Sequence, residues 1–246
     1  MTAVEPPIAA VTVVLAGLLG LLVGHLVNRA AGRFPWPARK RSWRQGADTP
    51  RDDGVSAPRR HDRGGAAVRG PVVEVGTALL FVLAALRFGL SWELPAFLFL
   101  AASGVLLAVI DLQHHLLPNR VVVPSIGIGA VLLLIAALAD QRWDALLRAV
   151  LGAVVLFVVF LVLALISPRS LGMGDVKLAA LVGLYLGWIG WDAVLVGAAA
   201  GFVIQALLAL VLLAGRRVGR RGELPFGPAM LLGAAAAIGG TPALLG

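Results

Sequence analysis

The chain has 246 residues, of which 59% are hydrophobic and only 14% are charged. Soluble domains carry about 45–50% apolar and about 25% charged residues, so this composition excludes a water-soluble globular protein and favours a membrane protein. The sequence contains no cysteine, which excludes disulfides, thiolate nucleophiles and cysteine-ligated zinc sites within it. The formal net charge of +8 is typical of Lys and Arg gathered in cytoplasmic loops, and we expect no binding to nucleic acid.

Eight apolar segments follow one another along the chain. Several reach the roughly 20 residues that a helix needs to cross a hydrocarbon core of about 30 Å. They lie at approximately 8–28, 71–88, 95–111, 121–139, 146–166, 176–190, 193–214 and 225–243. Because the backbone polar groups of a span must be satisfied within lipid, we expect these segments to be helices. The predicted fold is an all-α, polytopic transmembrane helical bundle of about eight spans.

The chain divides into three parts. Residues 1–28 form the first predicted span. Residues 29–70 hold eleven of the 21 Lys and Arg residues, with many Pro, Gly and Asp and few aliphatic side chains. We expect this part to be a cysteine-free basic cytoplasmic loop that is largely disordered and that meets anionic membrane lipids. Residues 71–246 carry the remaining spans and should form the membrane-embedded core.

The distribution of positive residues predicts the orientation of the spans. Short loops rich in Lys and Arg stay in the cytoplasm. With eight spans, one set of loops holds eighteen of the 21 Lys and Arg residues, and the alternate set holds only Arg87, Arg142 and Arg148. This asymmetry predicts that both ends of the chain lie outside and that the first connecting loop lies inside.

Two carboxylates border apolar segments on the predicted cytoplasmic side. Asp111 ends the third segment, and Asp175 opens the sixth after Gly172 and Gly174. Either acid alone could cap a helix or snorkel to the interface, but ionisable residues in spans are functional candidates. Two facing carboxyls can share a proton, so that one acts as an acid while the other activates water. Hydrolysis of a peptide bond needs both roles, and the glycines would expose the backbone there.

The helix dipole distinguishes the two acids. Asp175 lies at the N-terminus of its predicted helix, where the dipole favours negative charge, and Asp111 lies at a C-terminus, where the dipole disfavours it. We therefore predict that Asp175 is ionised at rest and that Asp111 holds the shared proton.

Other residues lie on the same predicted side. Glu74 opens the second span and could hydrogen-bond the acid pair or cap its helix. Pro118 precedes the fourth span, and Pro225-Phe226-Gly227-Pro228 is a turn that opens the eighth. Lys177 lies two positions after Asp175, off its helical face, and is expected to anchor to lipid phosphate.

Two groups of residues receive no catalytic role. Gly17, Gly20 and Gly24 have helical spacing and would let the first span approach a neighbour closely. His114 and His115 are adjacent but lack a third ligand nearby, so we expect no metal site.

In this order the motifs resemble those of the prepilin peptidase family, the membrane-embedded aspartic peptidases of the GxGD type. The resemblance rests on Gly24-x-x-x-Asn28-x-x-x-x-Arg33-x-Pro35, Arg69-x-Pro71-x-x-Glu74, Asp111 with Leu117-Pro118, Gly172-Met173-Gly174-Asp175-Val176-Lys177-Leu178, and Pro225-Phe226-Gly227-Pro228. It implies that Asp111 and Asp175 are the catalytic pair. We expect the supporting and substrate-binding residues to be Gly172, Gly174, Glu74, Pro118, Lys177, Pro225, Phe226 and Gly227.

The resemblance also implies a function. Members of the family remove the short basic leader peptide from type IV prepilins, or from pseudopilins of type II secretion, at the cytoplasmic face of the bacterial inner membrane. Residues 71–246 would then be the peptidase core. Many members also methylate the new N-terminus with S-adenosylmethionine, and these larger members carry a cysteine-rich zinc-binding insertion where this chain has its basic loop. We expect no zinc and no cofactor for proteolysis, and methylation stays open.

Three other functions stay open on the sequence alone. Paired acids and glycine-broken helices also occur in transporters, although those acids usually lie near the bilayer midplane. A non-catalytic pilus or secretion assembly protein is the second alternative, and it would keep its function after Asp111→Asn and Asp175→Asn. The third is a related peptidase of preflagellin-like proteins, which only substrate tests separate from a prepilin peptidase.

Overall fold

The computed structural model describes residues 6–33, 70–114, 117–167, 171–214 and 225–244. Within these ranges the chain forms helices and no strand. The helices are α1 (Pro6–Arg33), α2 (Gly70–Phe88), α3 (Leu94–His114), α4 (Asn119–Asp140), α5 (Trp143–Ile166), α6 (Met173–Ile189), α7 (Trp191–Ala214) and α8 (Gly227–Leu244). The predicted all-α fold is confirmed.

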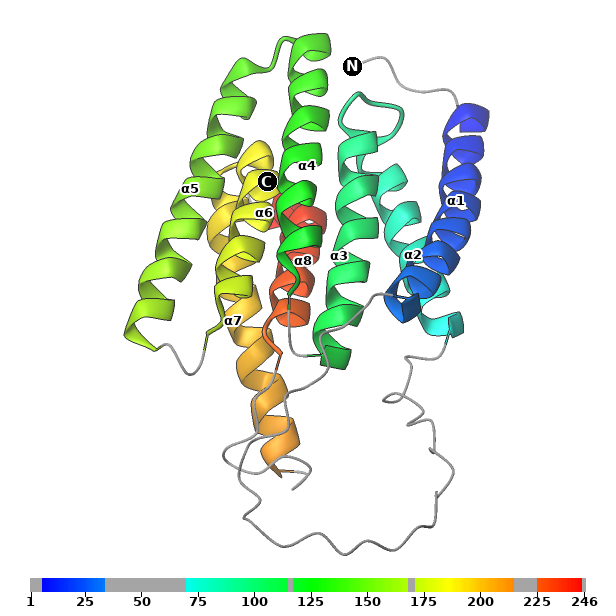
Figure 1. The fold of residues 1–246 in the computed structure, drawn as a ribbon. Helices are drawn as coiled ribbons and strands as arrows, with labels where there is room; N and C mark the ends of the chain where they lie inside the picture. The colour runs from blue at the N-terminus through cyan, green and yellow to red at the C-terminus, as the bar shows by residue number, and fades with distance from the viewer. Residues whose placement is uncertain (1–5, 34–69, 115–116, 168–170, 215–224, 245–246) are drawn as a thin grey trace, which may run out of the picture.

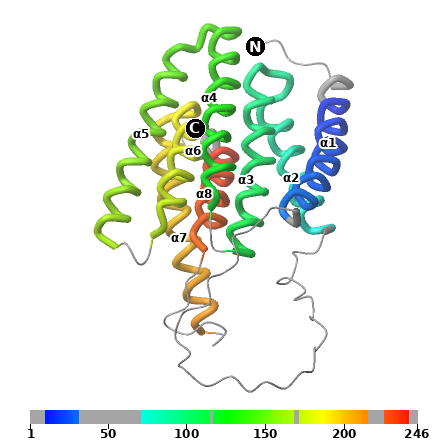
Figure 2. Tube along the Cα trace, viewed as in Figure 1, coloured from blue at the N-terminus to red at the C-terminus, as the bar shows by residue number. Residues whose placement is uncertain are grey.

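The helices lie side by side and alternate in direction, as Figure 1 shows and as the trace in Figure 2 repeats. The C-terminus of α3 therefore lies at the same end of the bundle as the N-termini of α6 and α8. We call this the lower end, as it is drawn in Figure 1, and the opposite one the upper end. Since Asp111 lies in the last turn of α3 and Asp175 in the first turn of α6, both acids belong to the lower end.

Six of the helices are long and apolar enough to cross a membrane, namely α1 to α5 and α7. The other two are shorter: α6 has 17 residues, and the apolar part of α8 runs over Gly227–Gly240. Every residue of α6 from Leu181 to Trp188 is buried, so α6 is the enclosed helix of the bundle. The chain is thus a multi-pass membrane protein in which longer helices surround a central helix of about 26 Å.

The backbone of α6 touches that of α5. A Cβ atom on Gly183 would lie 2.4 Å from the carbonyl oxygen of Gly152, and one on Gly187 would lie 2.4 Å from the carbonyl oxygen of Arg148. Small residues allow such close approach between membrane helices. The helix that carries Asp175 is therefore held by direct contact between backbones along its upper half.

The contact between α1 and α2 is similar. A Cβ atom on Gly20 would lie 2.6 Å from Cα of Ala78, and one on Gly24 would lie 2.7 Å from Cα of Glu74. The expected close approach through these glycines is confirmed. Helix α1 continues to Arg33, beyond the end expected for the first span, and residues 34–69 of the expected basic loop lie outside the described residues.

A polar cluster that the sequence did not suggest lies at the upper end. Glu93, just before α3, accepts hydrogen bonds from Arg142 NH1 at 3.0 Å and from Trp188 Nε1. The Arg142 guanidinium also lies over the Trp188 ring, 5.2 Å from its centroid. These contacts tie the start of α3, the α4–α5 turn and the end of α6 together.

Candidate active site

Asp111 is a buried acid held by a neighbouring helix. Only 5% of its surface is exposed, and its Oδ2 accepts a hydrogen bond of 3.0 Å from the backbone N–H of Gly227, the first residue of α8. A Cβ atom at position 227 would lie 2.7 Å from the same oxygen. Glycine is therefore the residue that lets the start of α8 reach this carboxyl group.

Asp175 is bonded to the start of its own helix. Its backbone N–H donates to the carbonyl oxygen of Gly172 at 3.0 Å, and the N–H of Gly172 donates back to Oδ2 of Asp175 at 3.2 Å. The capping role considered for Asp175 is thus real. It holds the carboxyl group at the N-terminus of α6, where the helix dipole favours negative charge.

The two acids influence each other. Asp175 precedes the apolar run of α6 and lies outside the six candidate spans. Burial and, after it, the repulsion between the two carboxylates when both are ionised raise the pKa of Asp175 to about 6, although the hydrogen bond from Gly172 opposes the shift. Like charges that lie close together titrate as a coupled pair, so we treat the two carboxyls together as the candidate acid pair.

Helix α8 lies between the elements that carry the acids. A Cβ atom on Gly227 would also lie 3.4 Å from Cδ2 of Leu178, which comes one turn after Asp175 on α6. Phe226 is buried, and its ring packs against Phe160 at 5.7 Å and Phe202 at 5.3 Å between centroids. These ring contacts fix the start of α8 and so the position of the Gly227 N–H. Pro225, before them, is half-buried.

The start of α6 also packs on the start of α4. A Cβ atom on Gly174 would lie 2.7 Å from Cβ of Leu117, so this glycine makes room for the connection from α3 to α4. The carbonyl oxygen of Pro118 accepts the N–H groups of Val121 and Val122 and begins α4. Lys177, expected to face lipid phosphate, donates to Oδ1 of Asn119 at 2.7 Å.

Glu74 lies between α1 and α2. Its Oε1 is 3.0 Å from Nδ1 of His25, a hydrogen bond that the sequence analysis missed. The only available signal was the position of His25 beside Gly24, where the two helices touch. A role for Glu74 at the acid pair stays a prediction.

Neither the acids nor the histidines form a metal cluster in the part of the chain that the structure describes. No group of three or more His, Cys, Asp or Glu side chains comes together there. The arrangement at the lower end is therefore a carboxyl pair supported by backbone N–H groups, which is suited to activating water and protonating a leaving group.

Comparison with known proteins supports this interpretation. Residues 97–215, which include both acids, match the model of the type IV leader peptidase family. The prepilin leader peptidase/N-methyltransferase of Bacillus subtilis is 36% identical over 167 residues, covering 66% of this chain and 62% of the relative. The prepilin leader peptidase/N-methyltransferase of Pseudomonas aeruginosa is 33% identical over 161 residues, and the alignment covers 65% of this chain and 54% of the relative.

The alignments thus leave a large part of each relative unmatched. The prepilin leader peptidase/N-methyltransferase of Stutzerimonas stutzeri is 32% identical over 164 residues, and the alignment covers 54% of its length. The chain thus spans about half the length of such relatives. No solved structure matches the chain. The family model and these relatives agree with the motifs and with the helical fold, and over residues 97–215 the chain is similar to the type IV leader peptidase family.

Proposed function

We propose that this chain is an aspartic endopeptidase that removes the leader peptide from type IV prepilins or pseudopilins. The observation that carries the proposal is that Asp111 and Asp175 come from two helices and both lie at the lower end of the bundle, where the start of α8 contacts Asp111 and lies beside Leu178, one turn after Asp175. The names of the family and of its relatives supply the substrate class.

In the proposed reaction the ionised acid takes a proton from a water molecule. The oxygen of that water attacks the carbonyl carbon of the scissile peptide bond while the neutral acid gives its proton to the carbonyl oxygen. The tetrahedral intermediate then collapses: its hydroxyl formed from the carbonyl oxygen returns its proton to the acid that gave it and becomes a carbonyl again, the C–N bond breaks, and the amine nitrogen takes up the proton that the base had received. The products are a free carboxyl group on the leader and a free amine on the mature protein.

We assign the resting charge to Asp175 and the proton to Asp111. Helix termini alone do not decide this, because Asp111 accepts an N–H from the start of α8 just as Asp175 accepts one from the start of α6. The deeper burial of Asp111, at 5% exposure, supports keeping the neutral form there.

We further propose that the lower end faces the cytoplasm. Arg29, Arg120 and Lys177 lie at this end. At the upper end, Arg142 and Arg148 are paired with Glu93 and Asp144, so their positive charge is largely compensated. This distribution supports the positive-inside orientation, in which we propose that the basic segment 29–70 is cytoplasmic and is attracted by anionic lipids. Residues 71–246 would be the peptidase core, after the first span at 1–28.

Methylation has no comparable support in this chain. The relatives are named N-methyltransferases, which implies S-adenosylmethionine for them. A pocket on α2, α3 and α8 is lined almost wholly by aliphatic and aromatic side chains and does not fit a cofactor with a ribose and an amino acid group. The cleavage experiment below therefore also tests for methyl transfer.

Cleavage of a co-expressed prepilin tests the proposal. The substrate mass is measured with the intact chain, with Asp111→Asn and with Asp175→Asn. We expect loss of the leader with the intact chain and with neither variant, and the same spectrum shows whether a methyl group is added. Cleavage that survives both substitutions would refute the acid pair. No cleavage of several well-expressed candidate substrates would favour the transport or assembly functions.

A further inference from the structure

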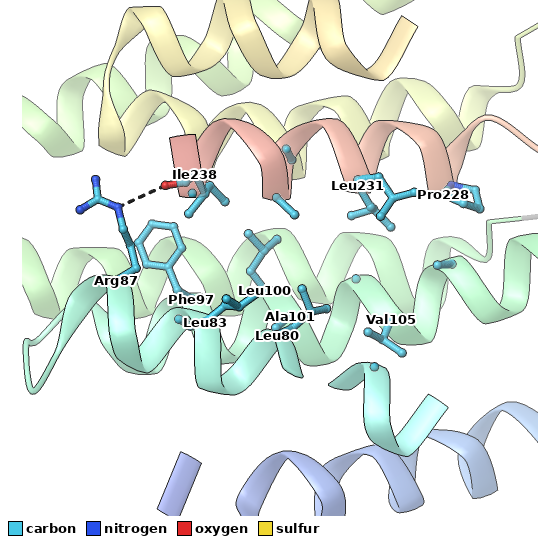
Figure 3. A pocket seen from close by; sticks show the side chains of 18 of the residues that line it. Leu80, Leu83, Arg87, Phe97, Leu100, Ala101, Val105, Pro228, Leu231 and Ile238 are labelled. Carbon is cyan, nitrogen blue, oxygen red and sulfur yellow. Dashed lines mark hydrogen bonds between the residues drawn. The ribbon is translucent and has the colours of Figure 1, made fainter. Parts of the chain in front are cut away.

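An apolar groove runs along one side of the bundle, between α2 and α8, with α3 as its floor. Its volume is about 690 Å³. Figure 3 shows Leu231, Pro228 and Ile238 of α8 on one side, facing Leu80 and Leu83 of α2 and Phe97, Leu100, Ala101 and Val105 of α3. Arg87 is the charged residue of the lining, and its Nε donates to the carbonyl oxygen of Ile238 at 3.2 Å.

The lower end of the groove lies beside the turn of α3 that carries Asp111. Its lower lining includes Leu112, the neighbour of Asp111, and Pro228, the neighbour of the Gly227 whose N–H holds that acid. On α3 the lining extends from Phe97 to Leu112, which is about 22 Å at 1.5 Å per residue. The groove therefore spans most of a bilayer core of about 30 Å and begins beside the candidate catalytic carboxyl.

The lining is suited to another helix. It contains many small residues, namely Gly76, Ala84, Ala101, Gly104, Ala108, Ala234, Ala235 and Gly239. Small residues are enriched where membrane helices meet, because they let backbones approach closely. An acyl chain of one leaflet would need neither such a row nor a groove that continues from the lower end to Arg87 at the upper end.

We propose that this groove binds the apolar helix of the substrate that follows the scissile bond. The inference rests on the proposed function and adds the place where the enzyme holds the part of the substrate that stays in the membrane. A substrate cut at the lower end has its apolar segment in the bilayer, and the groove receives that segment directly above the acid pair. The leader then lies below the acids, and binding of the helix sets which peptide bond reaches them.

Single cysteines can test the proposal because the chain has none of its own. Gly76 and Gly239 line the two ends of the groove, and a Cβ atom on either would meet no described atom within 4 Å. Gly127 on α4 has the same free space but lies outside the groove, so it is the matched control. Gly76→Cys, Gly239→Cys and Gly127→Cys are combined with Asp175→Asn to keep the substrate uncut.

Each variant is oxidised in membranes with prepilins that carry one cysteine at successive positions of the apolar segment. The bond between Arg87 and Ile238 puts Gly239 at the level of Arg87, eleven residues along α2 from Gly76. We therefore expect disulfides from both groove variants, at substrate positions about 11 residues apart, since both helices rise 1.5 Å per residue. We expect few disulfides from Gly127→Cys.

Equal yields from all three variants, or none from the groove variants, would overturn the proposal and favour lipid in the groove. Disulfides from Gly76→Cys alone would contradict binding of the substrate helix along the whole length of the groove. Cleavage of the same prepilin by the chain with Asp175 intact is measured in parallel. If that cleavage is absent, the proposed function fails; if it is present without selective disulfides, only the groove assignment fails.

A kinetic variant gives a second readout. Gly76→Trp fills the lower part of the groove, and we expect it to raise KM for the whole prepilin at least tenfold relative to Gly127→Trp. Equal KM values for the two variants would contradict the proposed binding of the substrate helix in the groove.

Discussion

The backbone N–H of Gly227 donates to Oδ2 of Asp111 at 3.0 Å, across 116 positions of sequence. Through this bond a third helix, α8, joins the two that carry the acids. The PFGP turn is therefore more than the start of a span: it puts a hydrogen-bond donor on a buried carboxyl group.

Gly227→Ala should reduce cleavage strongly. Its Cβ atom would lie 2.7 Å from the oxygen of Asp111, so either the carboxyl group or α8 must shift. A displacement of about 1 Å in an active site can lower the rate about 100-fold, and we expect a loss of kcat of that order. Gly240→Ala is the control on the same helix, because a Cβ atom there meets nothing described within 4 Å. Equal kcat values for the two variants would show that the contact does not position Asp111.

Gly174→Ala should lower stability much more than Gly172→Ala. A Cβ atom on Gly174 would lie 2.7 Å from Cβ of Leu117, whereas one on Gly172 would lie at an ordinary 3.7 Å from Oδ2 of Asp175. Overpacking of this kind typically costs about 1–3 kcal/mol. Thermal unfolding in detergent compares the two variants, and similar midpoints would contradict the packing argument. A loss of cleavage by Gly172→Ala at unchanged stability would indicate that this exposed glycine contacts the substrate.

The pH dependence of cleavage should identify the base. The pKa of Asp175 is raised to about 6, and a base must be ionised to act. If Asp175 is the base, kcat/KM should rise about tenfold per pH unit up to about pH 6 and then level off. If Asp175 is instead the acid, kcat/KM should fall as the pH rises through about 6. A rate profile from about pH 4.5 to about pH 8 distinguishes these outcomes.

The same pKa shift predicts a stability effect of Asp175→Asn. The folded protein holds the Asp175 proton more tightly than the unfolded chain, whose pKa is about 3.8. The contribution of Asp175 to wild-type stability is therefore fully present below about pH 4 and is lost as the pH rises through about 6, by up to about 3 kcal/mol. The variant lacks this titration, so its unfolding midpoint should exceed that of the wild type at about pH 7.5 but not at about pH 4. An equal difference at both pH values would contradict the assignment.

Glu93→Ala should affect stability without affecting catalysis. Glu93 accepts from Arg142 and Trp188 at the upper end, far from the acids, and the substitution leaves both donors without this partner. We expect a loss of about 1–3 kcal/mol and an unchanged kcat of the folded enzyme. Asp144→Ala, which breaks the exposed pair with Arg148, is the control and should hardly change the unfolding midpoint. A large loss of kcat in Glu93→Ala would mean that the upper end acts on the active site.

The helices and the position of Asp111 and Asp175 at helix ends could be predicted from the sequence because their signals are local. Apolar length marks each span, and Asp111 and Asp175 interrupt apolar runs at helix ends. The close approach at Gly20 and Gly24 was likewise visible as helical spacing of small residues.

Contacts between distant segments could not be predicted in this way. Nothing near Gly227 in the sequence indicates that its N–H meets Asp111, and nothing near Glu93 indicates Trp188. Such pairs depend on the order in which helices pack, which one sequence does not encode as a local pattern. The apolar groove also went unseen, because its lining residues look like ordinary span residues until three helices come together.

The glycine contact between α5 and α6 makes the active site sensitive to changes deep in the bundle. Gly183 and Gly187 lie two to three turns above Asp175 on the same straight helix. One added methyl group at either position would force the backbones of α5 and α6 apart and shift α6 within the bundle. The carboxyl group at the start of α6 would then shift relative to Asp111, so two glycines far from the acids help to set the geometry of the candidate site.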